Sequence, residues 1–178
     1  CKMTLAQEIT TAIKKTICRQ SAVLHEPSFK GNESKYVQEC IDSTFVSSVG
    51  KFVDRFEKEI ADYTGSKYAV AVVNGTAAMH IALLVAGVIS GDEVLVPALS
   101  FVAAANAVCY CGAIPNFVDI EEGTLGMNPV ALRNYLQVTT EQQSGMCVNI
   151  ETGRVIRALI PVHIFGHPCD LDGLLTVA

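Results

Sequence analysis

The sequence has no apolar run long enough to cross a membrane, and its amphipathic start over residues 3–20 lacks the apolar core of a signal peptide. It also has no cluster of Lys and Arg beyond Lys14 and Lys15. With a formal net charge of -5 and a pI near 5.3, a surface that binds polyanions is not expected. We therefore expect neither nucleic acid nor membrane among its partners.

Cysteine is present, but not in the spacing of a metal site. The seven cysteines are an odd number and include no CxxC pair, which argues against a disulfide framework and against a zinc site. Cys109 and Cys111 lie in an apolar segment that predicts a helix, so we expect them to be buried free thiols. Such thiols are typical of a reducing compartment, and the expected localisation is the cytoplasm.

No glycine-rich dinucleotide fingerprint and no Walker loop follows any expected strand. The chain does have apolar content, because 50% of its 178 residues are hydrophobic and its mean hydropathy is +0.35. That is enough for one substantial core. Because the sequence begins at Cys1 and stops at Ala178 inside an expected helix, we expect a fragment of a larger domain.

Hydrophobic spacing predicts helices over 4–18, 33–43 and 51–63, the last ended by Gly65, and then an alternation of strands and helices. The expected strands are 68–73, 93–96, 116–118 and 155–162, and the helices between and after them are 76–88, 101–111, 128–136 and one from Asp170. These strands do not alternate polar and apolar residues. Helices should therefore cover both faces of a mostly parallel sheet, in a three-layer α/β/α fold. The polar stretch 137–153 predicts a hairpin or a functional loop.

The most informative segment joins the expected strand 68–73 to the next helix through Asn74, Gly75, Thr76 and Ala77. Free backbone N–H groups and the helix dipole at such a start favour negative charge. Gly75 allows close approach, and Thr76 adds a hydroxyl donor. The segment therefore suits a phosphate group. The alternative is that a turn of small residues simply packs the helix on the sheet.

Ligands of such sheets bind beyond the carboxyl ends of the strands. The residues expected there are Asn74-Gly75-Thr76, Ser100, Phe101, Asp119 and His163. Phe101, at the head of a helix, could stack on a flat cofactor ring or act as a hydrophobic staple. His163 could contact a cofactor or be a hydrogen-bonded structural residue. Asp119 is expected to cap the next turn.

Several motifs follow one another along the chain. They are Ser48-Val49-Gly50 to Phe56-Glu57, Val73-Asn-Gly-Thr-Ala-Ala-Met-His80, Gly91-Asp-Glu-Val94 with Pro97, Ser100-Phe-Val-Ala-Ala-Ala-Asn106, Phe117-Val-Asp119 and Pro161-Val-His-Ile-Phe-Gly166. In this order they resemble the DegT/DnrJ/StrS family of pyridoxal-phosphate-dependent sugar aminotransferases, from about Pro27 onward. Residues 25–29 and 46–54, with the long segment before Val155, look most like the branch that aminates UDP-linked 4-keto-6-deoxy-HexNAc sugars in bacillosamine- and legionaminic-acid-type pathways.

The resemblance implies an incomplete fold-type-I large domain that binds pyridoxal 5'-phosphate. It implies that Gly75, Thr76 and Ala77 hold the cofactor phosphate and that Phe101 covers one face of the pyridine ring. His163 matches a family position and is assigned to the cofactor.

On the substrate side, the resemblance implies that His25, Ser48 and Gly50 lie near a sugar nucleotide, in the partner subunit's site of a homodimer. Asn106 also matches a family position and is assigned to the substrate. The expected domains are a helical lead-in over 1–50 and the first part of the cofactor-binding domain over 51–178.

The family's cofactor-linking lysine, and its aspartate that pairs with the pyridinium nitrogen, belong to segments after Ala178. We therefore expect no catalytic residue in this chain and no activity from it alone. The parent would transfer an amino group, from glutamate, to the 4-keto group of a nucleotide-linked 6-deoxy sugar. The alternatives are a sugar dehydratase of the same cofactor family, a non-catalytic module with this fold and, more distantly, a Rossmann-type oxidoreductase.

Overall fold

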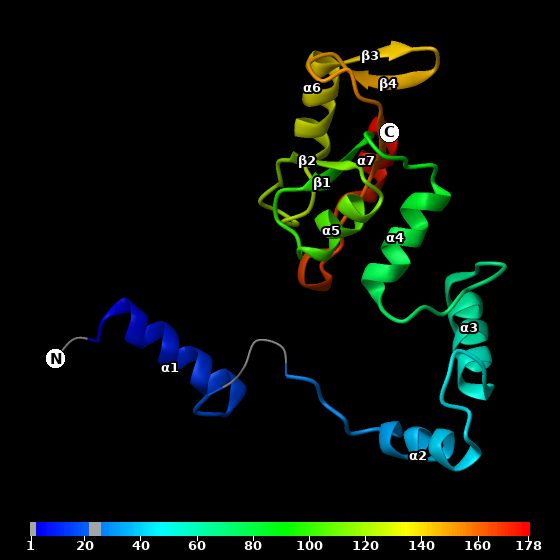
Figure 1. Ribbon diagram of the computed structural model, residues 1–178. Helices are drawn as coiled ribbons and strands as arrows, with labels where there is room; N and C mark the ends of the chain where they lie inside the picture. Colours follow the sequence, from blue (N-terminus) through cyan, green and yellow to red (C-terminus); the bar gives the residue numbers. More distant parts are fainter. Residues whose placement is uncertain (1–2, 22–25) are drawn as a thin grey trace. The chain divides into compact units, whose positions relative to one another are not determined.

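The computed structural model describes residues 3–21 and 26–178, in two compact units, Cys1–Ala71 and Val72–Ala178 (Figure 1). The first unit contains α1 (Leu5–Ile17), α2 (Glu33–Ser43) and α3 (Lys51–Thr64). The expected domain division between residues 50 and 51 would place α3 with the large domain, and that division stays a prediction. Within the described residues, no helix combines the length and the apolar character needed to cross a membrane.

Local signals set the ends of the helices in the first unit. Thr4 begins α1 with a capping box, in which its hydroxyl accepts from the N–H of Gln7 and its N–H donates to the Gln7 side chain. Gly65 ends α3 at φ 70°, the left-handed conformation that glycine adopts freely, which confirms the predicted stop. In the described part of this unit, α1, α2 and α3 have no buried residue, so the unit has little core of its own.

The second unit consists of a parallel sheet, a hairpin and flanking helices. Its elements are α4 (Gly75–Val85), β1 (Glu93–Pro97), α5 (Ala103–Tyr110), β2 (Ile114–Val118), α6 (Pro129–Thr139), β3 (Thr140–Gln143), β4 (Met146–Asn149), β5 (Ile156–Leu159), a short 3-10 helix (Ile164–Gly166) and α7 (Leu171–Val177). β1 lies in the middle of the sheet, parallel to both β2 and β5. The stretch 137–153 contains the antiparallel pair β3 and β4, which confirms the predicted hairpin.

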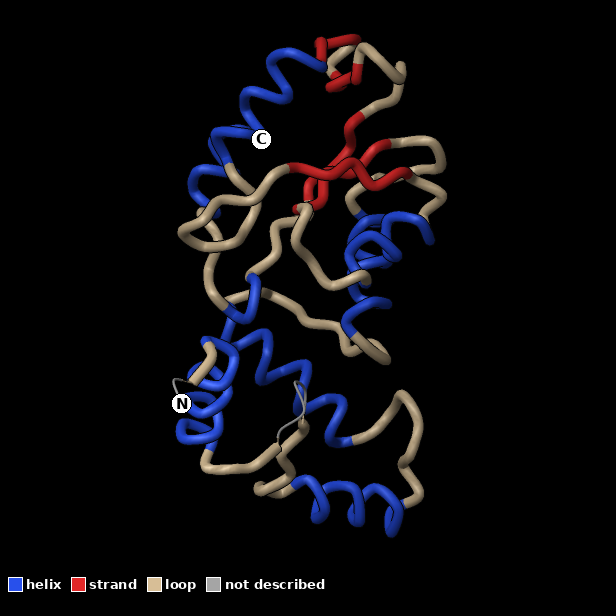
Figure 2. The backbone as a smooth tube through the Cα atoms, turned by 90° about the vertical axis from the view of Figure 1, so that its left-hand side faces the viewer, coloured by secondary structure: helices blue, strands red, loops and turns tan. Residues whose placement is uncertain are grey.

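Helices cover both faces of the sheet. Val94 and Val96 of β1 pack with residues of α4 and α5, whereas Leu95 packs with residues of α6 and α7. Because successive side chains of a strand point to opposite faces, these two clusters lie on opposite sides of β1. Figure 2 shows the strands between helices on either side. The predicted three-layer α/β/α arrangement is confirmed.

The structure corrects the prediction of a strand over residues 68–73. These residues pair with no strand in the described part of the chain, and Tyr68, Val70 and Val73 are exposed. Their backbone is held at Ala71, whose N–H donates to Oε1 of Glu57 at 2.8 Å. A strand forms only where a neighbouring strand completes its hydrogen bonds, so apolar composition alone predicted it wrongly.

The prediction for Cys109 is also corrected, because this side chain is exposed. The buried stripe of α5 is Ala104, Ala107 and Val108, and helical spacing turns residue 109 away from it. Cys111 is half-buried, and burial raises the pKa of its thiol.

A buried carboxylate that the sequence does not single out lies at the amino end of β1. The Glu93 side chain accepts hydrogen bonds from Asn116, Asn149 and Thr152 at 2.8, 3.0 and 2.6 Å. Burial by itself raises the pKa of Glu93, but these hydrogen bonds and the nearby Arg154 together outweigh it, and the pKa lies below its usual value. Glu93 therefore ties the sheet to the segment that follows the hairpin.

Candidate functional site

The carboxyl ends of β1, β2 and β5 lie at one edge of the sheet, because the three strands are adjacent and parallel. Ser100 and Phe101 follow β1, Asp119 follows β2, and His163 follows β5. The structure thus brings these four residues to the same edge, where ligands of parallel sheets bind. Residues 74–76 are also predicted at a strand end, but in the described part of the chain no strand precedes them.

The first turn of α4 presents backbone donors. Asn74 has an extended backbone, with φ -165° and ψ 169°, and its Oδ1 accepts from the N–H of Ala77 at 2.8 Å. Its carbonyl oxygen accepts from the N–H of Ala78. The N–H groups of Gly75 and Thr76 have no acceptor among residues 3–21 and 26–178, as is usual for the first two residues of a helix. Two donors therefore remain free at the positive end of the helix.

Neither the backbone nor the packing of the described chain requires glycine at position 75. Gly75 does not have a positive φ, and a Cβ built on it would meet no atom within 4 Å. Open space beside free N–H groups at a helix start fits an anion that approaches the backbone closely. These residues therefore fit the phosphate of a cofactor. The Ala77 N–H is already donated to Asn74, so the phosphate contact expected of Ala77 stays a prediction.

Phe101 presents its ring to the outside of this unit. The side chain is 76% exposed and directly precedes Val102, the residue at which α5 is capped, so that Ala103 is the first helical residue. A hydrophobic staple would pack this ring on the fourth helical residue, but that residue is the polar Asn106. The staple interpretation is therefore wrong, and one ring face is free to stack on a planar group. The substrate role expected of Asn106 stays a prediction.

His163 holds a turn. Its Nδ1 accepts from the N–H of Cys169 at 3.2 Å, and its carbonyl oxygen accepts from the N–H of Gly166. The structural interpretation thus has a geometric basis, whereas contact between His163 and the cofactor stays a prediction. With Nδ1 engaged as an acceptor, Nε2 is the ring nitrogen that can donate.

Asp119 does not cap the turn that follows it, contrary to the prediction. In that turn the hydroxyl of Thr124 donates to the Glu121 carboxylate at 2.6 Å and accepts from the N–H of Gly126. These nearer side chains satisfy the turn. Asp119 instead lines a small hollow of about 350 Å³ together with residues of α6.

The residues expected on the substrate side belong to the first unit. Gly50 precedes α3 with φ 152°, and a Cβ there would lie 3.3 Å from the Cβ of Phe45, so both conformation and packing explain this glycine. Ser48 is exposed. His25 lies outside the described residues. The substrate roles of these three residues stay predictions.

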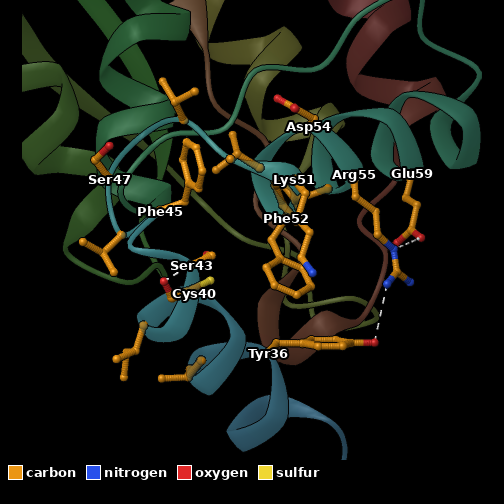
Figure 3. A pocket seen from close by; sticks show the side chains of 17 residues that line it. Tyr36, Cys40, Ser43, Phe45, Ser47, Lys51, Phe52, Asp54, Arg55 and Glu59 are labelled. Atoms are coloured by element: carbon orange, nitrogen blue, oxygen red, sulfur yellow. Dashed lines mark hydrogen bonds and ion pairs between the residues drawn. The ribbon is translucent and has the colours of Figure 1, made fainter.

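The first unit also contains an apolar hollow of about 940 Å³ lined by α2, α3 and the segment between them (Figure 3). On one side of it lie the rings of Tyr36 and Phe52, whose centroids are 4.8 Å apart. Arg55 donates to the Glu59 carboxylate at 2.7 Å and to the Tyr36 hydroxyl at 3.5 Å. Lys51, the other cation that lines the hollow, is paired with Glu39, so both cations already have a carboxylate partner. The free N–H groups at the start of α4 have no such partner among the described residues.

The sequence places Asn74 in the segment that suits a phosphate, but the prediction gives this residue no role of its own. A signal for it exists, because asparagine is among the preferred residues directly before a helix, where its side chain accepts from the first turn. Asn74 stands in that place, immediately before the small residues predicted to hold the phosphate.

Comparison with known proteins connects this geometry to a family. The model of the DegT/DnrJ/EryC1/StrS aminotransferase family matches residues 27–178. The GDP-perosamine synthase of Caulobacter vibrioides is 43% identical over 152 residues, which are 85% of this chain and 37% of that protein. The chain thus spans little more than a third of that relative's length.

Solved structures agree with the family match. An aminotransferase from Psychrobacter cryohalolentis has a TM-score of 0.71 and 31% identity, over 88% of this chain and 36% of that one. The PLP-form of Spr1654, a putative sugar aminotransferase from Streptococcus pneumoniae, has a TM-score of 0.67 and 27% identity, over 88% and 36% of the two chains. With its fold and most of its length matched, the chain belongs to the DegT/DnrJ/EryC1/StrS aminotransferase family.

Proposed function

We propose that the protein uses pyridoxal 5'-phosphate to transfer an amino group from glutamate to the 4-keto group of a nucleotide-linked 6-deoxy sugar. The observation that carries this proposal is the start of α4 in a chain of this family. There, two free N–H groups adjoin a glycine that nothing in the described chain requires. The PLP-form of the Streptococcus pneumoniae relative supports the same cofactor.

The residues of this chain would bind and orient the cofactor. The N–H groups of Gly75 and Thr76, with the Thr76 hydroxyl, would hold the phosphate at the positive end of α4. The exposed ring of Phe101 would cover one face of the pyridine ring and keep water from it. When bound, the cofactor supplies an electron sink for the carbon that carries the amino group.

The nucleotide of the substrate has two candidates. The motif resemblance favours a UDP-linked sugar, whereas the name of the Caulobacter vibrioides relative contains a GDP-linked one. The proposal covers what is common to both, a keto-sugar carried on a nucleoside diphosphate.

The test uses the full-length protein with pyridoxal phosphate, ¹⁵N-glutamate and either a UDP-linked or a GDP-linked 4-keto-6-deoxy sugar. We expect mass spectrometry to detect ¹⁵N in the sugar product with one of the two nucleotides. Cofactor binding without transfer of label to either sugar would contradict the aminotransferase proposal, and loss of the sugar oxygen without gain of nitrogen would indicate a dehydratase.

The Thr76→Val variant tests the phosphate contact. It keeps the shape of the side chain but removes a donor to a charged acceptor, a loss of roughly 1.5–3 kcal/mol in cofactor binding. Equilibrium titration with pyridoxal phosphate measures the dissociation constant, and an unchanged value would reject this site.

A further inference from the structure

We infer that Asn74 is a positioning residue for the phosphate cradle, by which we mean the N–H groups of Gly75 and Thr76 together with the Thr76 hydroxyl. This inference rests on the proposed function. Its observation is the hydrogen bond of 2.8 Å from the Ala77 N–H to Oδ1 of Asn74.

The first turn of α4 needs this hydrogen bond. It starts with Gly75 and Thr76, a residue of high backbone freedom followed by a β-branched one, and both are poor helix formers. No acidic side chain lies in this first turn to favour it through the helix dipole. The Asn74 cap therefore holds the first turn in the conformation that aims the cradle donors outward.

The cap also decides which donors stay free. Asn74 takes the N–H of Ala77, the third helical residue, and leaves those of Gly75 and Thr76 unused. The cradle thus keeps two adjacent donors next to the open space at Gly75.

The choice of an amide at this position has a physical reason. Aspartate caps helices as well as asparagine does, and Asp170 caps α7 of this chain by accepting from the N–H of Gly173 at 2.9 Å. A carboxylate at position 74 would put a negative charge beside a phosphate dianion. The neutral Asn74 caps the helix without that repulsion.

The test measures two quantities in the full-length protein, the dissociation constant for pyridoxal phosphate and the melting temperature without cofactor. The variants are Asn74→Ala, Asn74→Ser and Asn74→Asp. Asn128→Ala is the matched control, because Asn128 caps α6 in the same way by accepting from the N–H groups of Val130 and Ala131.

For Asn74→Ala we expect cofactor affinity about tenfold weaker, the size of effect that a lost cap has on helix formation. Asn74→Ser should bind within about threefold of the original protein, because the hydroxyl still caps. Asn74→Asp should keep the melting temperature but weaken binding by more than Asn74→Ala does. Asn128→Ala should lower the melting temperature and leave the dissociation constant unchanged.

Two results would overturn the inference. One is an Asn74→Ala protein that binds the cofactor as tightly as the Asn128→Ala control, and the other is an Asn74→Asp protein that binds as tightly as the original. If either occurs while Thr76→Val still weakens binding, the proposed function stands and only the role of Asn74 fails. Unchanged binding in Thr76→Val would instead reject the phosphate site itself.

Discussion

The exposed side chain of Phe101 leads to a prediction about cofactor affinity. If its free face covers the cofactor ring, Phe101→Ala should weaken cofactor binding by roughly 0.5–1.5 kcal/mol. Phe101→Tyr should bind the cofactor nearly as tightly as the original protein, because the aromatic ring is kept. Titration with pyridoxal phosphate, followed by absorption, measures both variants.

The control for Phe101 is Phe117→Ala, which removes another exposed aromatic side chain of the same unit, on β2. This change should leave cofactor affinity as it is. An equal fall in melting temperature with and without cofactor for Phe101→Ala would show that the ring is structural and that the stacking assignment is wrong.

Glu93 makes a prediction about pH. Its folded-state pKa lies below the usual value of 4.5, so the stabilisation from its hydrogen bonds is fully present above that value and is lost as the pH falls through the folded pKa. Glu93→Gln should lower the free energy of unfolding at neutral pH by roughly 1.5–3 kcal/mol, because the buried network loses the negative charge and one of its two acceptor oxygens. Below pH 4.5 the difference between the two proteins should shrink.

Urea unfolding at a series of pH values measures this difference. Glu141→Gln is the control, because Glu141 lies exposed on the hairpin strand β3. A Glu93→Gln deficit that stays constant from pH 7 to acid would contradict the role given to the ionised carboxylate.

At the scale of elements, the packing of the segments before α6 and α7 depends on one glycine. A Cβ at Gly126 would overlap the side chain of Cys169, which is buried in the cluster that contains Leu132 of α6 and Leu174 of α7. Gly126→Ala should therefore destabilise the protein by about 1–3 kcal/mol through overpacking. Gly123→Ala, three residues earlier, should cost little, because a Cβ there meets no atom within 4 Å. Equal urea midpoints for the two variants would contradict this account of the contact.

For the whole molecule, the features that the sequence predicts well are those determined by residues close by in the sequence. The stop at Gly65 and the hairpin in 137–153 follow from local turn and polarity signals, and both are present. Residues 68–73 have the composition of a strand, but pairing depends on a distant segment that composition does not reveal.

The candidate site divides in the same way. The donors at Gly75 and Thr76 follow from helix geometry, so the sequence suffices to predict them. The exposure of Phe101 and the engagement of His163 Nδ1 depend on packing with other elements, and the residues alone left alternatives open for both.

The two units of the molecule should differ in their resistance to proteolysis. In the described part of the first unit, no helix has a buried residue. The second unit has two buried clusters, one on each side of β1. A protease cuts where the backbone opens locally, and opening is easiest where few apolar contacts must break. Brief trypsin treatment of the 178-residue chain should therefore cut first after basic residues of the first unit, up to Lys67, and leave a fragment that begins at Tyr68.

Mass spectrometry of the early digest identifies the cuts. The basic residues of the second unit, Arg133, Arg154 and Arg157, offer trypsin an internal comparison within the same molecule. Arg154 is the sharpest of the three, because it is exposed in the turn before β5 and yet lies 3.9 Å from the buried Glu93 carboxylate. If the two clusters hold the second unit together, cleavage at Arg154 should follow cleavage at Lys58 and Lys67. Cleavage at Arg154 before these lysines would mean that the sheet and its covering helices open more readily than the helices of the first unit, contrary to the difference in buried core.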